Sequence, residues 1–91
     1  MIYEIEQAIR NEEISEVRRI LEEEPSEIDR KDVDGTLMAF LAAKTGNIAL
    51  VKYIVEYSRA SMNIVDDLHR NILHYGVMSG NVEVCKYLSR R

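Results

Sequence analysis

Tryptophan is absent from this chain of 91 residues, and it has one cysteine, one proline and four glycines. The single cysteine, Cys85, excludes an internal disulfide framework, and so little proline and glycine argues against a disordered chain. No apolar run approaches the roughly 18 residues of a membrane span. The first residues also lack the basic start and apolar run of a signal peptide. We therefore expect one small folded domain that is intracellular and cytoplasmic.

Excess charge of one sign is confined to the first third of the chain. The net charge is −4, and residues 1–31 hold ten acidic and five basic side chains. Residues 32–65 are balanced, and residues 66–91 carry one basic side chain in excess. Because binding to phosphate needs clustered Lys and Arg, the acidic third disfavours nucleic acid as a partner. The sequence likewise predicts no membrane partner.

What the chain does contain is a repeat. Residues 46–54, GNIALVKYI, recur 34 residues later as GNVEVCKYL, and a fainter copy, EEISEVRRI, lies 34 residues earlier. The apolar columns at this spacing keep their character, as in Ala8/Ala42/Gly76, Ile9/Ala43/Val77, Ile14/Ile48/Val82, Val17/Val51/Cys85 and Ile20/Ile54/Leu88. Helix pairs too small to bury their own apolar stripe do so by stacking on identical neighbours. The period therefore predicts a stacked all-α repeat.

Local signals place the helices of the first unit. Apolar residues at helical spacing predict a short helix over residues 2–10, beginning its stripe at Ile2. Asn11 is the expected cap of a second helix that begins near Ile14, and Pro25 should end that helix. Residues 25–36 are expected to form a polar connector with a tight turn at Asp34-Gly35.

The second and third units repeat this plan. Each is expected to hold a helix that ends at a glycine, Gly46 or Gly80, and an asparagine that caps the following helix, Asn47 or Asn81. Asn71 should cap the first helix of the third unit.

The second and third units resemble repeats of the ankyrin repeat family, whose repeat is a hairpin and two helices. Residues 32–47 resemble the family line D-x-x-G-x-T-P-L-H-x-A-A-x-x-G, and they keep Asp32, Gly35, Ala42, Ala43 and Gly46. Residues 66–81 keep Asp66, Leu73, His74 and Gly80, with His69 in the place of the turn glycine. The alternative is a tetratricopeptide array, but the connectors and the Asp-Gly turn here suit ankyrin hairpins better.

The resemblance implies an all-α, ankyrin-like solenoid of stacked helix-turn-helix pairs joined by hairpin loops, with residues 1–91 as a single domain. Residues 1–24 would be an N-terminal capping repeat, residues 32–58 the second repeat, and residues 66–91 a truncated third repeat. Without a matching cap, one flank of the third unit should be unprotected at Leu73, Val77, Val82 and Cys85. Either more repeats follow, or this end meets a partner or a second copy of the chain.

No catalytic constellation is evident in the sequence. His74 matches the family histidine, which the resemblance says bonds to backbone between neighbouring hairpins, and His69 is expected to be a solvated residue at a loop tip. Cys85 is expected to be a small core hydrophobe. No second ligand stands at metal spacing, and no Gly-rich phosphate loop is present. We therefore expect no catalytic residues, no metal and no cofactor.

Basic residues also recur at the repeat spacing, as Arg18, Lys52 and Lys86. This column is either an ordinary solvated face or a weak groove for an acidic partner.

The resemblance implies that a partner binds to the hairpin tips and to the exposed face of the first helix of each pair. Those positions are Val33, Asp34, Thr36, Lys44, Thr45, Asp67, Leu68, Arg70, Met78 and Ser79. We therefore expect a non-catalytic protein–protein interaction module. The alternatives are a regulatory or targeting segment of a larger multidomain enzyme, and a unit that self-associates through its uncapped C-terminal end.

Overall fold

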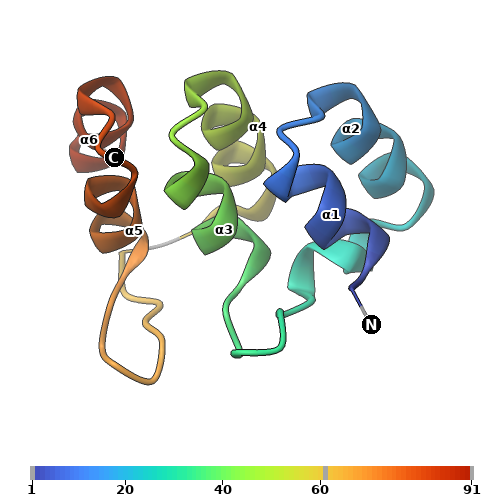
Figure 1. The fold of residues 1–91 in the computed structure, drawn as a ribbon, viewed down its shortest axis with the longest axis horizontal. Helices are drawn as coiled ribbons and strands as arrows, with labels where there is room; N and C mark the ends of the chain where they lie inside the picture. Colours follow the sequence, from blue (N-terminus) through green and yellow to red (C-terminus); the bar gives the residue numbers. More distant parts are fainter. Residues whose placement is uncertain (1, 61, 91) are drawn as a thin grey trace.

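The computed structural model describes residues 2–60 and 62–90, so the two ends of the predicted domain, Met1 and Arg91, lie outside the description. Three helix pairs stand side by side in chain order, and long loops project from one edge of the stack (Figure 1). The helices are α1 (Glu4–Arg10), α2 (Ile14–Glu23), α3 (Met38–Thr45), α4 (Ile48–Ser58), α5 (Ile72–Ser79) and α6 (Val82–Ser89). The predicted all-α solenoid of stacked pairs is confirmed. Within the described ranges, no helix is long and apolar enough to span a membrane.

The start of the chain corrects two sequence predictions. Helix α1 begins at Glu4 rather than at residue 2, and Ile2 precedes it with 58% of its surface exposed. Asn11 does not cap the second helix. It closes α1 instead, because its backbone N–H donates to the carbonyl of Gln7. Helix α2 begins after Glu13 without a side-chain cap.

The first connector is more ordered than the sequence indicates. Helix α2 ends at Glu23, ahead of Pro25 as predicted, but the residues that follow form a short 3₁₀ helix, η1 (Pro25–Asp29). Proline suits this position because its fixed φ matches the first turn of a helix. The only strand-like feature among the described residues is an isolated antiparallel bridge between Lys31 and Leu37, at the base of the first hairpin.

The breaks inside the second and third pairs are built as predicted. Gly46 and Gly80 end α3 and α5 in the left-handed conformation, with φ of 75° and 73°. Asn47 and Asn81 then cap α4 and α6 by accepting backbone N–H groups of the first turn. The Asn81 amide also donates to the Gly46 carbonyl at 2.7 Å, so the break of one pair is bonded to the break of the next.

The core is continuous, because helices pack against each other both within a pair and between neighbouring pairs. Ala42 and Ala43 on α3 are completely buried, and small side chains there let α1 and α5 pack closely on both sides. Phe40, on the same helix, is 2% exposed and its ring stacks on that of Tyr75 with centroids 4.8 Å apart. Helix α3 is therefore the element against which the two outer pairs are positioned.

The two hairpins have the same backbone. The first hairpin (residues 32–36) turns at Gly35 with φ of 80°, and the second hairpin (residues 66–70) turns at His69 with φ of 59°. His69 thus occupies the turn-glycine position, exposed as the sequence predicts, in a conformation that side chains other than glycine adopt at a cost.

We expect His69→Gly to raise the free energy of unfolding by about 0.5 kcal/mol. The gain is limited because removing left-handed strain is partly offset by the greater flexibility of unfolded glycine. The reciprocal variant Gly35→His should lose a similar amount, since no atom of the described residues lies within 4 Å of the Cβ it would add and the change acts through backbone conformation. Urea unfolding monitored by circular dichroism measures both, and a loss of stability in His69→Gly would contradict the assignment.

Candidate functional site

Each hairpin is held by one aspartate that binds the backbone of the turn. Asp32 Oδ1 accepts the backbone N–H groups of Asp34 at 2.9 Å and Thr36 at 2.8 Å. Asp66 Oδ1 accepts those of Leu68 and Arg70, both at 2.9 Å. Because one oxygen of each carboxylate binds main-chain donors, these bonds hold the turn without using the side chains at positions 33, 34, 67 and 68.

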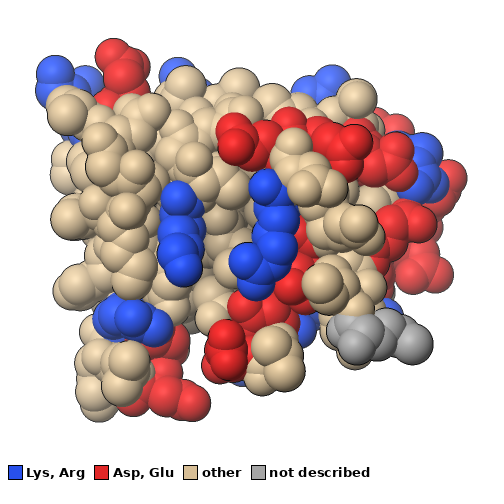
Figure 2. Space-filling model, viewed as in Figure 1, with Lys and Arg blue, Asp and Glu red and all other residues tan. Residues whose placement is uncertain are grey.

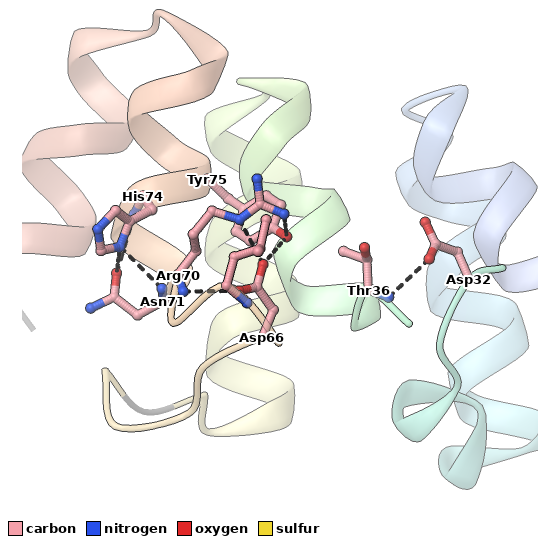
Figure 3. A network of polar contacts seen from close by, with 8 residues as sticks. Asp32, Thr36, Asp66, Arg70, Asn71, His74 and Tyr75 are labelled. Carbon is pink, nitrogen blue, oxygen red and sulfur yellow. Dashed lines mark hydrogen bonds and ion pairs between the residues drawn. The ribbon is translucent and has the colours of Figure 1, made fainter. Parts of the chain in front are cut away.

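The second oxygen of each carboxylate binds a cation, and the two hairpins differ here. Asp32 Oδ2 accepts from Arg10 of α1 at 3.1 Å, and Arg10 also binds Glu6, so the preceding helix reaches the next hairpin. Asp66 Oδ2 accepts from the Arg70 Nε at 2.7 Å and from the Tyr75 hydroxyl at 2.6 Å. Figure 3 shows this network running from the second hairpin to α5.

The network favours the ionised carboxylate of Asp66. Partial loss of solvent acts to raise the pKa of Asp66, but the hydrogen bonds from Tyr75, Arg70 and the Leu68 backbone outweigh it and hold that pKa well below its usual range. Burial, and then the bond to Asp66, raise the pKa of the Tyr75 hydroxyl. The hydroxyl therefore stays protonated and acts as a donor.

We expect the stability contributed by Asp66 to disappear in acid. Because the folded pKa is depressed, the contribution is fully present above the unfolded pKa of about 3.9 and is lost as pH falls from there towards the folded pKa. Asp66→Asn should therefore be less stable than the wild type at pH 7, and the gap should narrow as pH falls from about 4 towards 2.

Asp34→Asn is the matched control for that prediction, since it removes the same charge from an exposed tip where the Asp34 side chain forms no ion pair with any described residue. Urea midpoints measured between pH 7 and pH 2 give both profiles. Parallel profiles for the two variants would show that the Asp66 network contributes nothing specific.

The hairpins and the first helices enclose a groove of about 380 Å³, here called the hairpin groove. It lies between the two hairpins and the exposed faces of α3 and α5. Of the ten residues predicted to bind a partner, seven line it: Asp34, Thr36, Lys44, Asp67, Leu68, Arg70 and Met78. The structure thus gathers residues up to 44 positions apart in the sequence into one concavity.

The remaining three predicted residues lie elsewhere. Val33 is at the first tip and is 95% exposed, so it can reach a partner from the rim. Thr45 and Ser79 are half-buried in the breaks between helices. Their hydroxyls donate to the carbonyls of Ala42 and Gly76 and accept the N–H of the following asparagine. These two hydroxyls are thus engaged with the main chain.

Six further residues line the hairpin groove without having been predicted to bind a partner: Arg10, Asp32, Gly35, Leu41, Asp66 and Tyr75. In the sequence, Asp32, Gly35 and Asp66 are recognised only as residues of the family pattern. Two of the others, Arg10 and Tyr75, take part in the polar network. Arg10 could have been found, because it stands 34 residues before Lys44 and 68 before Met78 in one column. Tyr75 carries no such signal, because its role depends on the second hairpin folding back onto α5.

Some basic side chains of the hairpin groove are paired with carboxylates and one is not. Arg10 and Arg70 are paired with carboxylates, whereas Lys44, at the position equivalent to Arg10, has no ion pair with any described residue. Lys44 lacks this ion pair because Asp66, the carboxylate equivalent to Asp32, is bound to Arg70 instead. Figure 2 shows basic side chains side by side over the middle of this face, with acidic side chains at the hairpin edge and, in greater number, over the first pair at the right.

His74 does not make the contact that the resemblance implied. Its side chain is exposed, and its Nδ1 lies 3.1 Å from the backbone N of Asn71, which donates to it. The Asn71 side chain in turn accepts the His74 backbone N–H, so the two residues cap α5 reciprocally (Figure 3). The histidine is therefore bonded within its own unit rather than between hairpins. Asparagine at the family's threonine position provides the geometry for this exchange.

The flank of the third pair is open, as the sequence predicts. Val77 and Val82 are 63% and 65% exposed, while Leu73 and Cys85 are half-buried, so Cys85 is less enclosed than a core position. A largely apolar groove of about 430 Å³ lies on this flank beside Leu73 and Val77. Across residues 2–60 and 62–90, no three His, Cys, Asp or Glu side chains group as a metal site would require.

Stacked helix pairs joined by projecting hairpins are also the architecture of a known protein family. A model of ankyrin repeats, in three copies, matches residues 5–91. The chain belongs to the ankyrin repeat family. Proteins of this family are generally interaction modules without catalytic activity, and their concave surfaces bind other proteins.

Individual relatives are consistent with this membership. The chain is 37% identical over 73 residues to ankyrin repeat and SAM domain-containing protein 6 of Rattus norvegicus, and 36% identical to that of Mus musculus. Each match covers 79% of this chain and only 8% of the relative. A chain in the solved complex of the Bd0816 predatory endopeptidase of Bdellovibrio bacteriovorus with immunity protein Bd3460 superposes with a TM-score of 0.81. That superposition covers 98% of this chain and 46% of the other at 16% identity, which indicates a shared fold.

Proposed function

We propose that this protein is a non-catalytic module that binds a protein partner in the hairpin groove. The observation that carries the proposal is the convergence of two hairpins and the first helices on one concavity. Its lining includes Lys44, which forms no ion pair with any described residue. The groove is also rigid, because the aspartate anchors and the packed helices fix its walls. A preformed surface avoids much of the ordering cost that weakens binding.

The exposed side chains indicate what kind of segment would fit. Each tip displays one apolar and one acidic residue, Val33 with Asp34 and Leu68 with Asp67. A partner segment with apolar side chains for the tips, a basic group for their carboxylates and an acidic group for Lys44 matches this arrangement. Apolar groups such as Leu68, 69% exposed, are the natural centre of such an interface.

A pulldown from cell extract tests the proposal. The triple variant Val33→Asp, Leu68→Asp, Met78→Asp should lose proteins that the wild type recovers, because charge is placed at three exposed apolar contacts. The control, Ile64→Asp with Val65→Asp, places two such charges on exposed apolar connector residues outside the groove, and Leu68→Asp with Met78→Asp is the variant that matches it in number and charge. Recovery of the same proteins by wild type and triple variant would show that this face is the wrong one.

The open flank supports a second candidate, self-association through the third pair. Val77 and Val82 place apolar surface where, in the second pair, the equivalent Ala43 is buried by α5. Sedimentation equilibrium should show the wild type dimerising at micromolar to millimolar concentration and Val77→Lys with Val82→Lys remaining monomeric. A wild type that stays monomeric throughout that range would reject this candidate.

A further inference from the structure

A second groove lies away from the hairpins, between the second helices of the last two pairs. This helix groove has a volume of about 390 Å³ and is lined by Ile48, Lys52, Glu83, Lys86, Tyr87 and Arg90. Three of these six side chains are basic and one is acidic, in a chain whose net charge is −4. Helices α4 and α6, which form its walls, stand side by side (Figure 1).

Cations on the second helices are oriented by tyrosines of the following pair. The Arg18 guanidinium lies 5.2 Å from the ring centre of Tyr53, and the Lys52 ammonium lies 5.7 Å from that of Tyr87. An aromatic face holds a cation without cancelling its charge, unlike a carboxylate. Lys52 is therefore positioned at the helix groove while its positive charge stays available to a ligand.

The charge pattern of the repeat changes at this groove. In the first two pairs, the cation is followed four residues later by a glutamate, as Arg18 by Glu22 and Lys52 by Glu56. In the third pair, Lys86 is followed at the same spacing by Arg90. Like charges at this spacing on a helix repel. Neither Lys86 nor Arg90 forms an ion pair with any described residue, so the protein leaves this repulsion unrelieved.

We propose that the helix groove binds an acidic peptide segment, with two or three carboxylates meeting Lys52, Lys86 and Arg90. Complementary charge sets both the attraction and the register of such a segment. Ile48 and Tyr87 give apolar contact to the residues between the carboxylates. A nucleic acid fits less well, because three cations beside Glu83 do not form the extended track that a phosphate backbone follows. This site is separate from the hairpin groove, so the two can be tested independently.

Fluorescence anisotropy of the intact chain with a labelled probe peptide of six glutamates and one central leucine tests the proposal. The wild type should bind in low-salt buffer, and added salt should weaken binding. Lys86→Glu with Arg90→Glu should weaken it at least about tenfold, because attraction becomes repulsion. Lys31→Glu with Arg59→Glu changes the net charge equally at exposed residues outside the groove and should retain binding.

Each other outcome would overturn the proposal. These are no binding by the wild type at low salt, equal weakening by the two double variants, and tighter binding of oligothymidine than of the acidic peptide. Thermal unfolding of every variant verifies that it is folded, and Lys86→Gln with Arg90→Gln replaces the glutamate variant if that one unfolds. The neutral pair should still bind more weakly than the wild type.

Discussion

Replacement of Phe40 by alanine should lower the free energy of unfolding by about 3–5 kcal/mol, the usual cost of emptying a buried aromatic site. Phe40 is the largest of the fully buried side chains and its ring stacks on Tyr75 of the next pair. Its removal would leave a cavity between the second and third pairs, and α5 would lose the surface that positions it. Since small domains have little stability in excess, the variant should be largely unfolded at 37 °C.

Urea unfolding at 25 °C, followed by circular dichroism and linear extrapolation, measures this loss. Phe40→Leu provides an intermediate if the alanine variant does not fold, because it keeps most of the apolar volume. Val33→Ala is the control, since a side chain that is 95% exposed contributes no packing. A loss below about 1 kcal/mol for Phe40→Ala would mean that the site collapses around the missing ring.

Gly76→Leu should be the second most damaging change, with an expected loss of about 1–3 kcal/mol from overpacking. A Cβ at this position would lie 2.8 Å from the Leu88 Cδ1 and 3.4 Å from the Val84 Cγ1, both on α6. A longer side chain has no space between α5 and α6 and would push them apart.

Gly76→Ala shows how much of the destabilisation comes from replacing glycine and how much comes from the larger side chain of leucine. Leu88 Cδ1 is the end of a flexible side chain and can move aside for one methyl group, while alanine gains about 0.8–1 kcal/mol of helix propensity. The alanine variant should therefore unfold within about 1 kcal/mol of the wild type. If leucine and alanine behave alike in urea unfolding, the α5–α6 contact is looser than the distances indicate.

The 34-residue period predicts most of the fold because the residues that recur at this spacing are those that the turns and helix ends physically require. Gly46 and Gly80 are needed where the chain turns with positive φ, and the following asparagines have donors to satisfy. The first unit was harder to interpret. Glu12 stands where the other units have glycine, yet it adopts the same left-handed conformation with φ of 57°. Because a glutamate does not signal a turn as glycine does, the sequence predicts the wrong role for Asn11.

The sequence predicts many of the residues that lie around the groove, but it does not predict which side chains bind each other there. The family resemblance names, as contacts for a partner, seven of the thirteen residues that line the hairpin groove, and their arrangement in one concavity follows from stacking the units. Which carboxylate binds which cation depends on side-chain reach. Arg70 binds Asp66 within its own hairpin, whereas Arg10 crosses between units to Asp32. Nothing in the spacing distinguishes these two solutions, so the isolation of Lys44 could not be predicted.

The aspartate anchors have a consequence for how such a protein can change over generations. Asp32 and Asp66 fix each turn through main-chain donors, and these bonds do not involve the side chains of Val33 or Leu68. Mutations at Val33 or Leu68 can therefore accumulate and be selected for a new ligand while the scaffold stays intact. The two tips already carry their apolar and acidic residues in opposite order, on turns held by equivalent hydrogen bonds. Because anchoring and recognition use different residues, the binding preference of the tips can evolve with almost no loss of folding stability.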